Sequence, residues 1–147
     1  MTEFKYKTWD EVEEGDVIAE FEMDITFRKV IQNVVATRDF FPGHHNPEYA
    51  RAQGVENIYL NTFFYAGLID RVVTDAFGPD VFIKRRKFRM LVPVPAESKI
   101  AVFGRVRRKF IINGKRTVLV DVSILRRDRH AQACVAEVLV EFPDAST

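Results

Sequence analysis

The sequence N-T-F-F-Y-A-G-L-I-D-R-V-V-T-D-A-F, residues 61–77, predicts the helix that decides the architecture. Asn61 or Thr62 can cap its first turn. Gly78 and Pro79 end it, because proline cannot continue a helix. Its first half has almost no polar face, and polar residues appear only in the second half. We therefore expect its N-terminal turns to be surrounded by protein.

The chain after this helix is rich in β-forming residues. The predicted strands are V-F-I-K-R-R-K-F-R-M-L-V (81–92), K-I-A-V-F-G-R-V-R-R-K-F-I-I (99–112), K-R-T-V-L-V-D-V-S-I-L-R (115–126) and A-Q-A-C-V-A-E-V-L-V-E-F (131–142). Asn113 and Gly114, between the second and third, give the strongest short hairpin signal. In the third, apolar residues alternate with Thr117, Asp121 and Ser123, which predicts one buried and one solvated face.

The chain before this helix predicts one more strand and helical segments. Residues 17–26, V-I-A-E-F-E-M-D-I-T, alternate as a strand does, and Thr26 can cap a helix. Phe27 begins an apolar stripe at helical spacing that ends near Arg38. The composite is an α+β fold in which an antiparallel sheet wraps around an apolar helix. This architecture is the hot-dog fold.

Length and composition favour one domain over residues 1–147. A chain of 147 residues with 47% hydrophobic composition can bury a sizeable core. Its formal net charge of +1 gives no general reason to expect nucleic acid or a membrane surface as a partner. The N-terminus has no apolar signal core, and no apolar run approaches the ~18 residues of a membrane span. We therefore expect a soluble cytoplasmic protein.

The chemistry is concentrated in D-F-F-P-G-H-H-N-P-E-Y-A, residues 39–50. Pro42 and Gly43 prevent the preceding helix from continuing, so Asp39 lies at its exit and His44 lies in a loop. Pro47 can then open a short helical turn. Loops between rigid elements can bring together side chains that one continuous helix would separate.

This stretch resembles the MaoC-like (R)-specific enoyl-CoA hydratases and dehydratases. The family pattern is an aspartate, four residues, a histidine and then x-[DN]-P-x-x-A. Asp39 is followed by four residues and His44, and the pattern continues in register with His45, Asn46, Pro47 and Ala50. The resemblance extends in weaker form over nearly the whole chain.

The chain also departs from the common form of this family. Phe40, Phe41, Pro42 and Gly43 stand where x-N-P-x is usual, and Leu60, Asn61 and Thr62 replace a His-Gly-Met. Both changes resemble the subgroup found in steroid side-chain degradation. Some members of that subgroup work as heteromeric pairs in which one subunit keeps the aspartate and histidine. This chain keeps both residues, so the resemblance implies the active member.

The resemblance implies reversible addition of water to a trans-2-enoyl-CoA, with coenzyme A thioester as substrate and no cofactor. Asp39 and His44 would hold the water and share the proton transfers. The backbone N–H of Asn61 or Thr62 would receive the thioester oxygen, because unpaired N–H groups at a helix start favour developing negative charge. Candidate substrate-binding residues around them are Phe40, Phe41, Asn46 and Phe64. For Phe63 and Phe64 we favour ordinary packing.

A basic block follows the long helix. It comprises Lys84, Arg85, Arg86, Lys87 and Arg89, followed on the next predicted strand by Arg105, Arg107, Arg108 and Lys109. Lys84 and Arg86 are candidates for binding coenzyme A phosphates, with a nucleic-acid surface as a weaker competitor. We favour a solvated sheet face or an edge strand protected by charge. Arg126, Arg127 and Arg129 are expected to be solvated in a turn.

Several alternatives stay open. Asp39 can simply cap loop amides, and His44 can be a structural histidine. A hot-dog thioesterase would use a carboxylate on the long helix, for which Asp70 is the nearest candidate. A metal site formed by Asp39, His44 and His45 has little support.

The partner is also open. The resemblance implies a homodimer or a dimer of dimers, or a heteromer with a second MaoC-like subunit. A non-catalytic acyl-binding subunit would need that second chain for turnover. The subgroup resemblance and the small residues Ala66 and Gly67 favour steroid-derived or other bulky acyl groups over short fatty chains. The exact acyl group, the physiological direction and the choice between coenzyme A and acyl carrier protein are not determined by the sequence.

Overall fold

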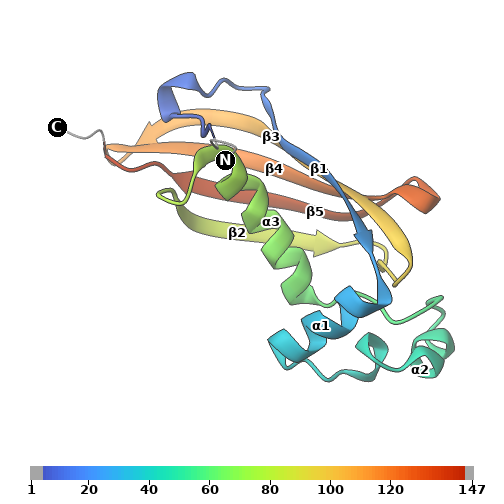
Figure 1. Ribbon diagram of the computed structural model, residues 1–147. Helices are drawn as coiled ribbons and strands as arrows, with labels where there is room; N and C mark the ends of the chain where they lie inside the picture. The colour runs from blue at the N-terminus through green and yellow to red at the C-terminus, as the bar shows by residue number, and fades with distance from the viewer. Residues whose placement is uncertain (1–4, 145–147) are drawn as a thin grey trace.

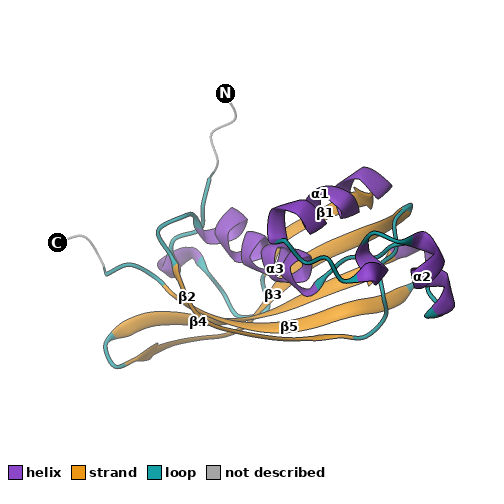
Figure 2. Ribbon diagram, turned by 90° about the horizontal axis from the view of Figure 1, so that it is seen from below, coloured by secondary structure: helices purple, strands orange, loops and turns teal. Residues whose placement is uncertain are grey.

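The computed structural model describes residues 5–144 as one antiparallel sheet of five strands curved around a long helix, α3 (Thr62–Phe77) (Figures 1 and 2). The strands are β1 (Val17–Ile25), β2 (Phe82–Met90), β3 (Ser98–Ile112), β4 (Lys115–Arg126) and β5 (Ala131–Glu141). Their order across the sheet is β1-β3-β4-β5-β2, so β1 and β2 are the edges. The predicted α+β hot-dog architecture is confirmed.

The helices are α1 (Phe27–Thr37), α2 (Pro47–Ala52) and α3 (Thr62–Phe77), with short 3-10 turns η1 (Trp9–Glu11), η2 (Pro42–His44) and η3 (Arg127–Arg129). Thr26 caps α1 by accepting a hydrogen bond from Lys29 N, and Arg38, with φ 57°, ends it as predicted. Asn61, not Thr62, caps α3. Helices α1 and α2 lie together near the N-terminal end of α3 (Figure 1). Within residues 5–144, no helix is long and apolar enough to cross a bilayer.

The β3–β4 hairpin turns at the predicted residues. Asn113 and Gly114 have φ of 51° and 75°, and Ile112 is paired with Lys115 across the turn. Positive φ at both central positions is the geometry of a type I′ turn, which matches the right-handed twist of the strands. This local match fixes the register of the two longest strands.

The core lies between α3 and the concave face of the sheet. Ile69, Val72 and Val73 of α3 have no exposed surface. Gly104 of β3 allows α3 to approach closely, because a Cβ there would lie 2.6 Å from Val72 Cγ1. The contacting sheet residues include Val102, Val106, Val118, Val120, Val122, Val138 and Val140. The buried valines give this region its rigidity.

Two expectations about burial were wrong. The N-terminal turns of α3 are not enclosed, since Phe63 is 62% exposed and Thr62 and Gly67 are also exposed. The reason is geometric, because this end of the helix extends toward α1 and α2, past the part of the sheet that covers its second half (Figure 1).

Thr117, expected on a solvated face, is buried. Its hydroxyl donates to Lys115 O at 3.1 Å, so its burial leaves no unpaired polar group.

The basic block is divided between separate parts of the sheet. Strand β2 is an edge, whereas β3 is separated from it by β4 and β5. Three of the β2 side chains are ion-paired within the chain, Lys84 with Glu141, Arg85 with Glu137 and Arg86 with Asp70. This agrees with the interpretation of a charged edge strand.

Candidate active site

Asp39 and His44 come together at the end of α1. His44 Nε2 lies 3.6 Å from Asp39 Oδ2, and the two side chains are 10% and 30% exposed. Asp39 follows the left-handed residue Arg38, and His44 ends the η2 turn, so the chain reverses between them. The loop between helices therefore converges these two groups, as the sequence pattern requires.

The His44 ring has a defined orientation. Its Nδ1 lies 2.7 Å from the carbonyl oxygen of Tyr59. A carbonyl only accepts hydrogen bonds, so Nδ1 carries the proton and donates. In neutral His44, the Nε2 lone pair is then directed at Asp39. A backbone carbonyl thus fixes the tautomer that can accept a proton from water.

Aromatic rings enclose His44. The rings of Phe41 and Tyr59 meet the imidazole edge to face, with centroids 5.4 Å and 5.0 Å away. Phe41 also packs against Tyr49 at 5.6 Å. Partial burial raises the pKa of the Tyr59 phenol above its ordinary value.

A pocket of about 290 Å³ opens beside His44. Its lining is mostly apolar and consists of His44, Tyr59, Leu60, Asn61, Thr62, Tyr65, Met90, Leu91, Val92 and Pro93. Asp39 does not line this pocket but lies next to His44, which does. A larger hollow of about 730 Å³ lies on the outer sheet face, but its lining contains neither Asp39 nor His44. The smaller pocket is therefore the candidate site, because it joins an imidazole to a helix start.

The start of α3 supplies free hydrogen-bond donors to this pocket. Asn61 Oδ1 accepts from Phe64 N at 3.0 Å. Among residues 5–144, no acceptor is hydrogen-bonded to the backbone N–H of Asn61 or Thr62. Unpaired donors at the positive end of a helix dipole suit an oxyanion.

The cap residue Asn61 is tightly held. It is 1% exposed, its Oδ1 accepts from Asn33 Nδ2 at 2.7 Å, and its Nδ2 donates to Thr37 Oγ1 at 2.8 Å. Asn33 and Thr37 belong to α1, the helix that leads into Asp39. The cap therefore ties the helix start to the element that carries the carboxylate.

The other predicted site residues are less central. Phe40 is 63% exposed and Phe41 43% exposed, at the rim of the loop. Asn46 caps α2 by accepting from Glu48 N and Tyr49 N, the local role expected of it. Phe64 packs against the core, as favoured, whereas Phe63 does not. None of these four phenylalanines lines the pocket, whose lining instead includes Tyr59 and Tyr65.

Lys84 and Arg86 also lie outside the pocket lining. Lys84 Nζ is 2.5 Å from Glu141 Oε1, and Arg86 pairs with Asp70 on α3. A phosphate would have to compete with these carboxylates. By contrast, Lys87 and Arg89 make no ion pair with any of residues 5–144.

His45 has a separate role from His44. It is exposed, and its Nε2 lies 2.9 Å from Phe40 O. Within residues 5–144, no group of three or more His, Cys, Asp or Glu side chains is arranged to hold a metal ion. The ring of His45 instead closes the loop on itself.

The sequence did not predict the positions of two residues, Tyr59 and Arg126. Tyr59 acts through its backbone carbonyl, which any residue provides, so no side-chain pattern could identify it. Arg126 was expected to be solvated, and that prediction was wrong, because it is 4% exposed. A signal was present: Arg126 continues the alternation of Val122 and Ile124, the inward face of β4.

The chain is similar in sequence to a hydratase subunit. No family model matches the chain. It is 37% identical over 94 residues, 63% of this chain and 71% of the other, to the 3-oxo-4,17-pregnadiene-20-carboxyl-CoA hydratase beta subunit of Mycobacterium tuberculosis.

The similar solved structures have the same fold. One chain of the ChsH1-ChsH2 complex from Mycobacterium tuberculosis superimposes with TM-score 0.80 and 28% identity, covering 89% of this chain and 98% of that one. The R-hydratase PhaJ1 from Pseudomonas aeruginosa gives TM-score 0.80 with 19% identity, covering 93% and 86%. At that identity the second comparison supports the fold only.

Proposed function

Because this chain belongs to the MaoC-like hydratase and dehydratase family, we propose that it is an enoyl-CoA hydratase that adds water reversibly to a trans-2-enoyl-CoA. The observation that carries the proposal is the 3.6 Å separation of Asp39 Oδ2 and His44 Nε2 next to the unpaired N–H groups of α3. That separation is too long for a direct hydrogen bond and suits a bridging water.

In the proposed reaction, the oxygen of the held water bonds to C3 of the substrate. One proton of this water passes to the Asp39–His44 pair, and the pair delivers a proton to C2, so that one molecule of water is added. The double bond's electrons move through an enolate, whose oxygen accepts from the backbone N–H of Asn61 or Thr62. In reverse, the same groups eliminate water from a 3-hydroxyacyl thioester.

Each part of this site contributes a limited share of the rate. Acid–base assistance typically contributes ~10²–10⁴-fold, and one oxyanion donor roughly 2.7–4 kcal/mol. Neither alone gives an efficient enzyme, so the site depends on the loop and the helix start being held together. The thioester is the substrate, and this scheme requires no cofactor.

A second MaoC-like subunit is the proposed partner. Large apolar side chains are exposed near the pocket, including Phe63 at 62%, Met90 at 48% and Leu91 at 43%. An exposed apolar cluster next to an unpaired sheet edge is typical of an interaction surface. The relative is named a beta subunit, and the 28% identical structure is a complex.

The acyl group is proposed to be bulky and of the steroid side-chain type. This rests on the substrate in the relative's name, a pregnadiene carboxyl-CoA. A straight short-chain enoyl group is the alternative substrate. The assay below separates the two.

The test follows the loss of enoyl-thioester absorbance with crotonyl-CoA and with a bulky cyclic enoyl-CoA. Asp39→Asn and His44→Gln are expected to reduce the hydration rate by ~10²–10⁴-fold. His45→Gln is the matched control, since that ring faces Phe40 O, and it should keep wild-type activity. Wild-type rates in both catalytic variants would refute the assignment, and release of free thiol would instead indicate a thioesterase.

The partner is tested with the same assay. The mass in solution is measured for the chain alone and after co-expression with a second MaoC-like chain. Association that raises the hydration rate is the expected result. A monomer with full activity would contradict the partner proposal while leaving the hydratase proposal intact.

A further inference from the structure

We propose that Arg126 is a positioning residue for His44, holding the backbone segment whose carbonyl orients the imidazole. The inference rests on the proposed hydratase function of the Asp39–His44 pair. It concerns a side chain that touches neither the pocket nor the pair. This role would explain why an arginine is buried at the end of β4.

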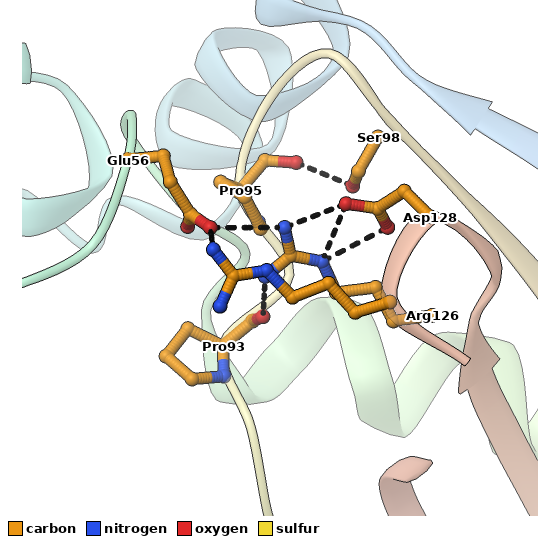
Figure 3. A network of polar contacts seen from close by, with 7 residues as sticks. Glu56, Pro93, Pro95, Ser98, Arg126 and Asp128 are labelled. Atoms are coloured by element: carbon orange, nitrogen blue, oxygen red, sulfur yellow. Dashed lines mark hydrogen bonds and ion pairs between the residues drawn. The ribbon is translucent and has the colours of Figure 1, made fainter. Parts of the chain in front are cut away.

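The Arg126 guanidinium connects parts of the chain that are distant in sequence (Figure 3). Its Nε and Nη2 donate to the Asp128 carboxylate at 3.0 Å and 2.7 Å, and Nη2 also donates to Glu56 Oε1 at 3.3 Å. Its Nη1 donates to the carbonyl of Pro93 at 3.2 Å. The planar fork of arginine can make all these bonds at once, which lysine cannot.

The positive and negative charges around Arg126 nearly cancel. Arg129 also pairs with Glu56, so two arginines face two carboxylates. Hydrogen bonding from Arg126 holds the pKa of Asp128 below its usual range. The Arg126 side chain is only 5% exposed, so its charge is compensated by partners rather than by water.

Glu56 and Pro93 each lead into a short extended segment, and these two segments pair with each other. Ala96 N donates to Ile58 O at 2.7 Å, and Leu60 N donates to Val94 O at 3.0 Å. An isolated bridge joins Tyr59 and Pro95 between them. Arg126 therefore connects the entrances of both arms of a small ladder outside the main sheet.

The centre of this ladder contacts the catalytic loop. Tyr59 N donates to Gly43 O at 3.2 Å, and Tyr59 O accepts from His44 Nδ1 at 2.7 Å. The Tyr59 backbone thus contacts the loop on both sides of the Gly43–His44 bond. A shift of the ladder changes the direction of the imidazole and weakens the bond that sets its tautomer.

Ser98 strengthens the second arm. Its hydroxyl is buried and donates to Pro95 O at 2.7 Å (Figure 3). This bond holds the second arm at Pro95, and Arg126 holds it at Pro93. Of these two side chains, only Arg126 also bonds to the lead-in of the first arm, at Glu56, so it braces the two arms in addition to the backbone bonds between them.

The test compares Arg126→Met with Arg126→Lys and with Arg127→Met. Arg127 is the neighbouring exposed arginine, paired with Glu22 on β1 at 2.9 Å, so its loss is a matched control that leaves the ladder intact. For Arg126→Met we expect kcat to fall by ~10–100-fold, with KM changed much less, because misplacement by about 1 Å costs up to about 10²-fold. Arg126→Lys should recover part of kcat, and Arg127→Met should match wild type.

A second measurement reports the imidazole directly. Nitrogen-15 NMR of the His44 side chain in the free protein distinguishes the Nδ1–H from the Nε2–H tautomer. We expect a single Nδ1–H form in wild type and a mixture in Arg126→Met. If Arg126→Met does not fold, Glu56→Gln serves instead, because it keeps the volume and removes one charged partner of the arginine.

The outcomes separate this proposal from the proposed function. A folded Arg126→Met protein with wild-type kcat, or with an unchanged His44 tautomer, would overturn the positioning role. If wild type shows no hydration at all, the proposed function fails, while the tautomer measurement still decides whether Arg126 orients His44. A mixed tautomer in Arg126→Met with an unchanged spectrum in Arg127→Met supports the role.

Discussion

The sheet and the segment between α1 and α3 are held together in different ways. In the sheet, backbone pairs repeat along every strand and buried valines cover one face. In residues 38–61, backbone pairing is limited to the short ladder at 58–60, and individual bonds hold the other points, such as the Tyr59 carbonyl on His44 and the Asn61 side chain on α1. In the sheet, neighbouring pairs keep a strand in place when one contact is lost. In this segment, loss of one contact should displace the residue that it holds. The predictions below test that difference.

The largest expected effect is that of Gly43→Ala. A Cβ at this position would lie 2.4 Å from Tyr59 Oη and 2.8 Å from Phe41 Cε1, so both rings must move. These rings enclose His44, and its displacement should lower kcat by about 100-fold. Steady-state hydration kinetics measure the effect.

Gly67→Ala is the control for this substitution. No atom lies within 4 Å of a Cβ built there, and the position is inside α3. Alanine is a better helix former, so the free energy of unfolding should rise by roughly 0.5–1 kcal/mol with unchanged kcat. Equal kinetic losses in both variants would show that the loop is no more sensitive than the helix.

The next largest effect is expected on the free energy of unfolding when either asparagine cap is removed. Asn61→Ala removes the cap of α3 together with the partners of Asn33 and Thr37, and should lower the free energy of unfolding by about 2–3 kcal/mol. Asn46→Ala removes only local bonds of α2 and should cost about 1 kcal/mol. Urea unfolding measures both, and equal losses would contradict a linking role for Asn61.

A pH-dependent effect is expected for Asp128→Asn. Arg126 lowers the pKa of Asp128 in the folded state below the ordinary value of 3.8. The carboxylate therefore stabilises the folded protein above about pH 3.8, and this contribution disappears as pH falls through the lower folded pKa. The stability difference between wild type and Asp128→Asn should be constant near neutral pH and shrink in acid.

The Arg126→Met background is the control for this pH effect. Without the guanidinium, the largest cause of the lowered Asp128 pKa is removed and the charge of Arg129 remains, so Asp128→Asn should produce a smaller acid-dependent difference in unfolding free energy. An undiminished difference would contradict the role of Arg126.

The smallest effect is expected on the outer sheet face. Arg107 pairs with Asp121 and with Glu137, and its side chain is 46% exposed. Exposed ion pairs contribute little and are screened by salt, so Arg107→Ala should change stability by less than about 1 kcal/mol, and by less still in about 0.5 M salt. Thermal unfolding at low and high salt checks this, and a large salt-insensitive loss would contradict it.

Local sequence patterns predicted most of the fold. β-forming composition and alternation identified the strands, Asn113 and Gly114 identified the hairpin, and Pro42 and Gly43 identified the break that carries His44. These signals succeed because the conformations depend on neighbouring residues. The exposure of Phe63 was not predictable in this way, since it depends on where the sheet stops covering α3.

The sequence by itself determined the hot-dog fold and the loop spacing that makes Asp39 and His44 candidates, because periodicity and turn chemistry are local. Tertiary structure alone decided which groups orient them. The Tyr59 carbonyl has no side-chain signature, and the partners of Arg126 at 56 and 93 are far from it in sequence. Contacts of that kind arise only when the folded sheet brings distant segments within hydrogen-bonding distance.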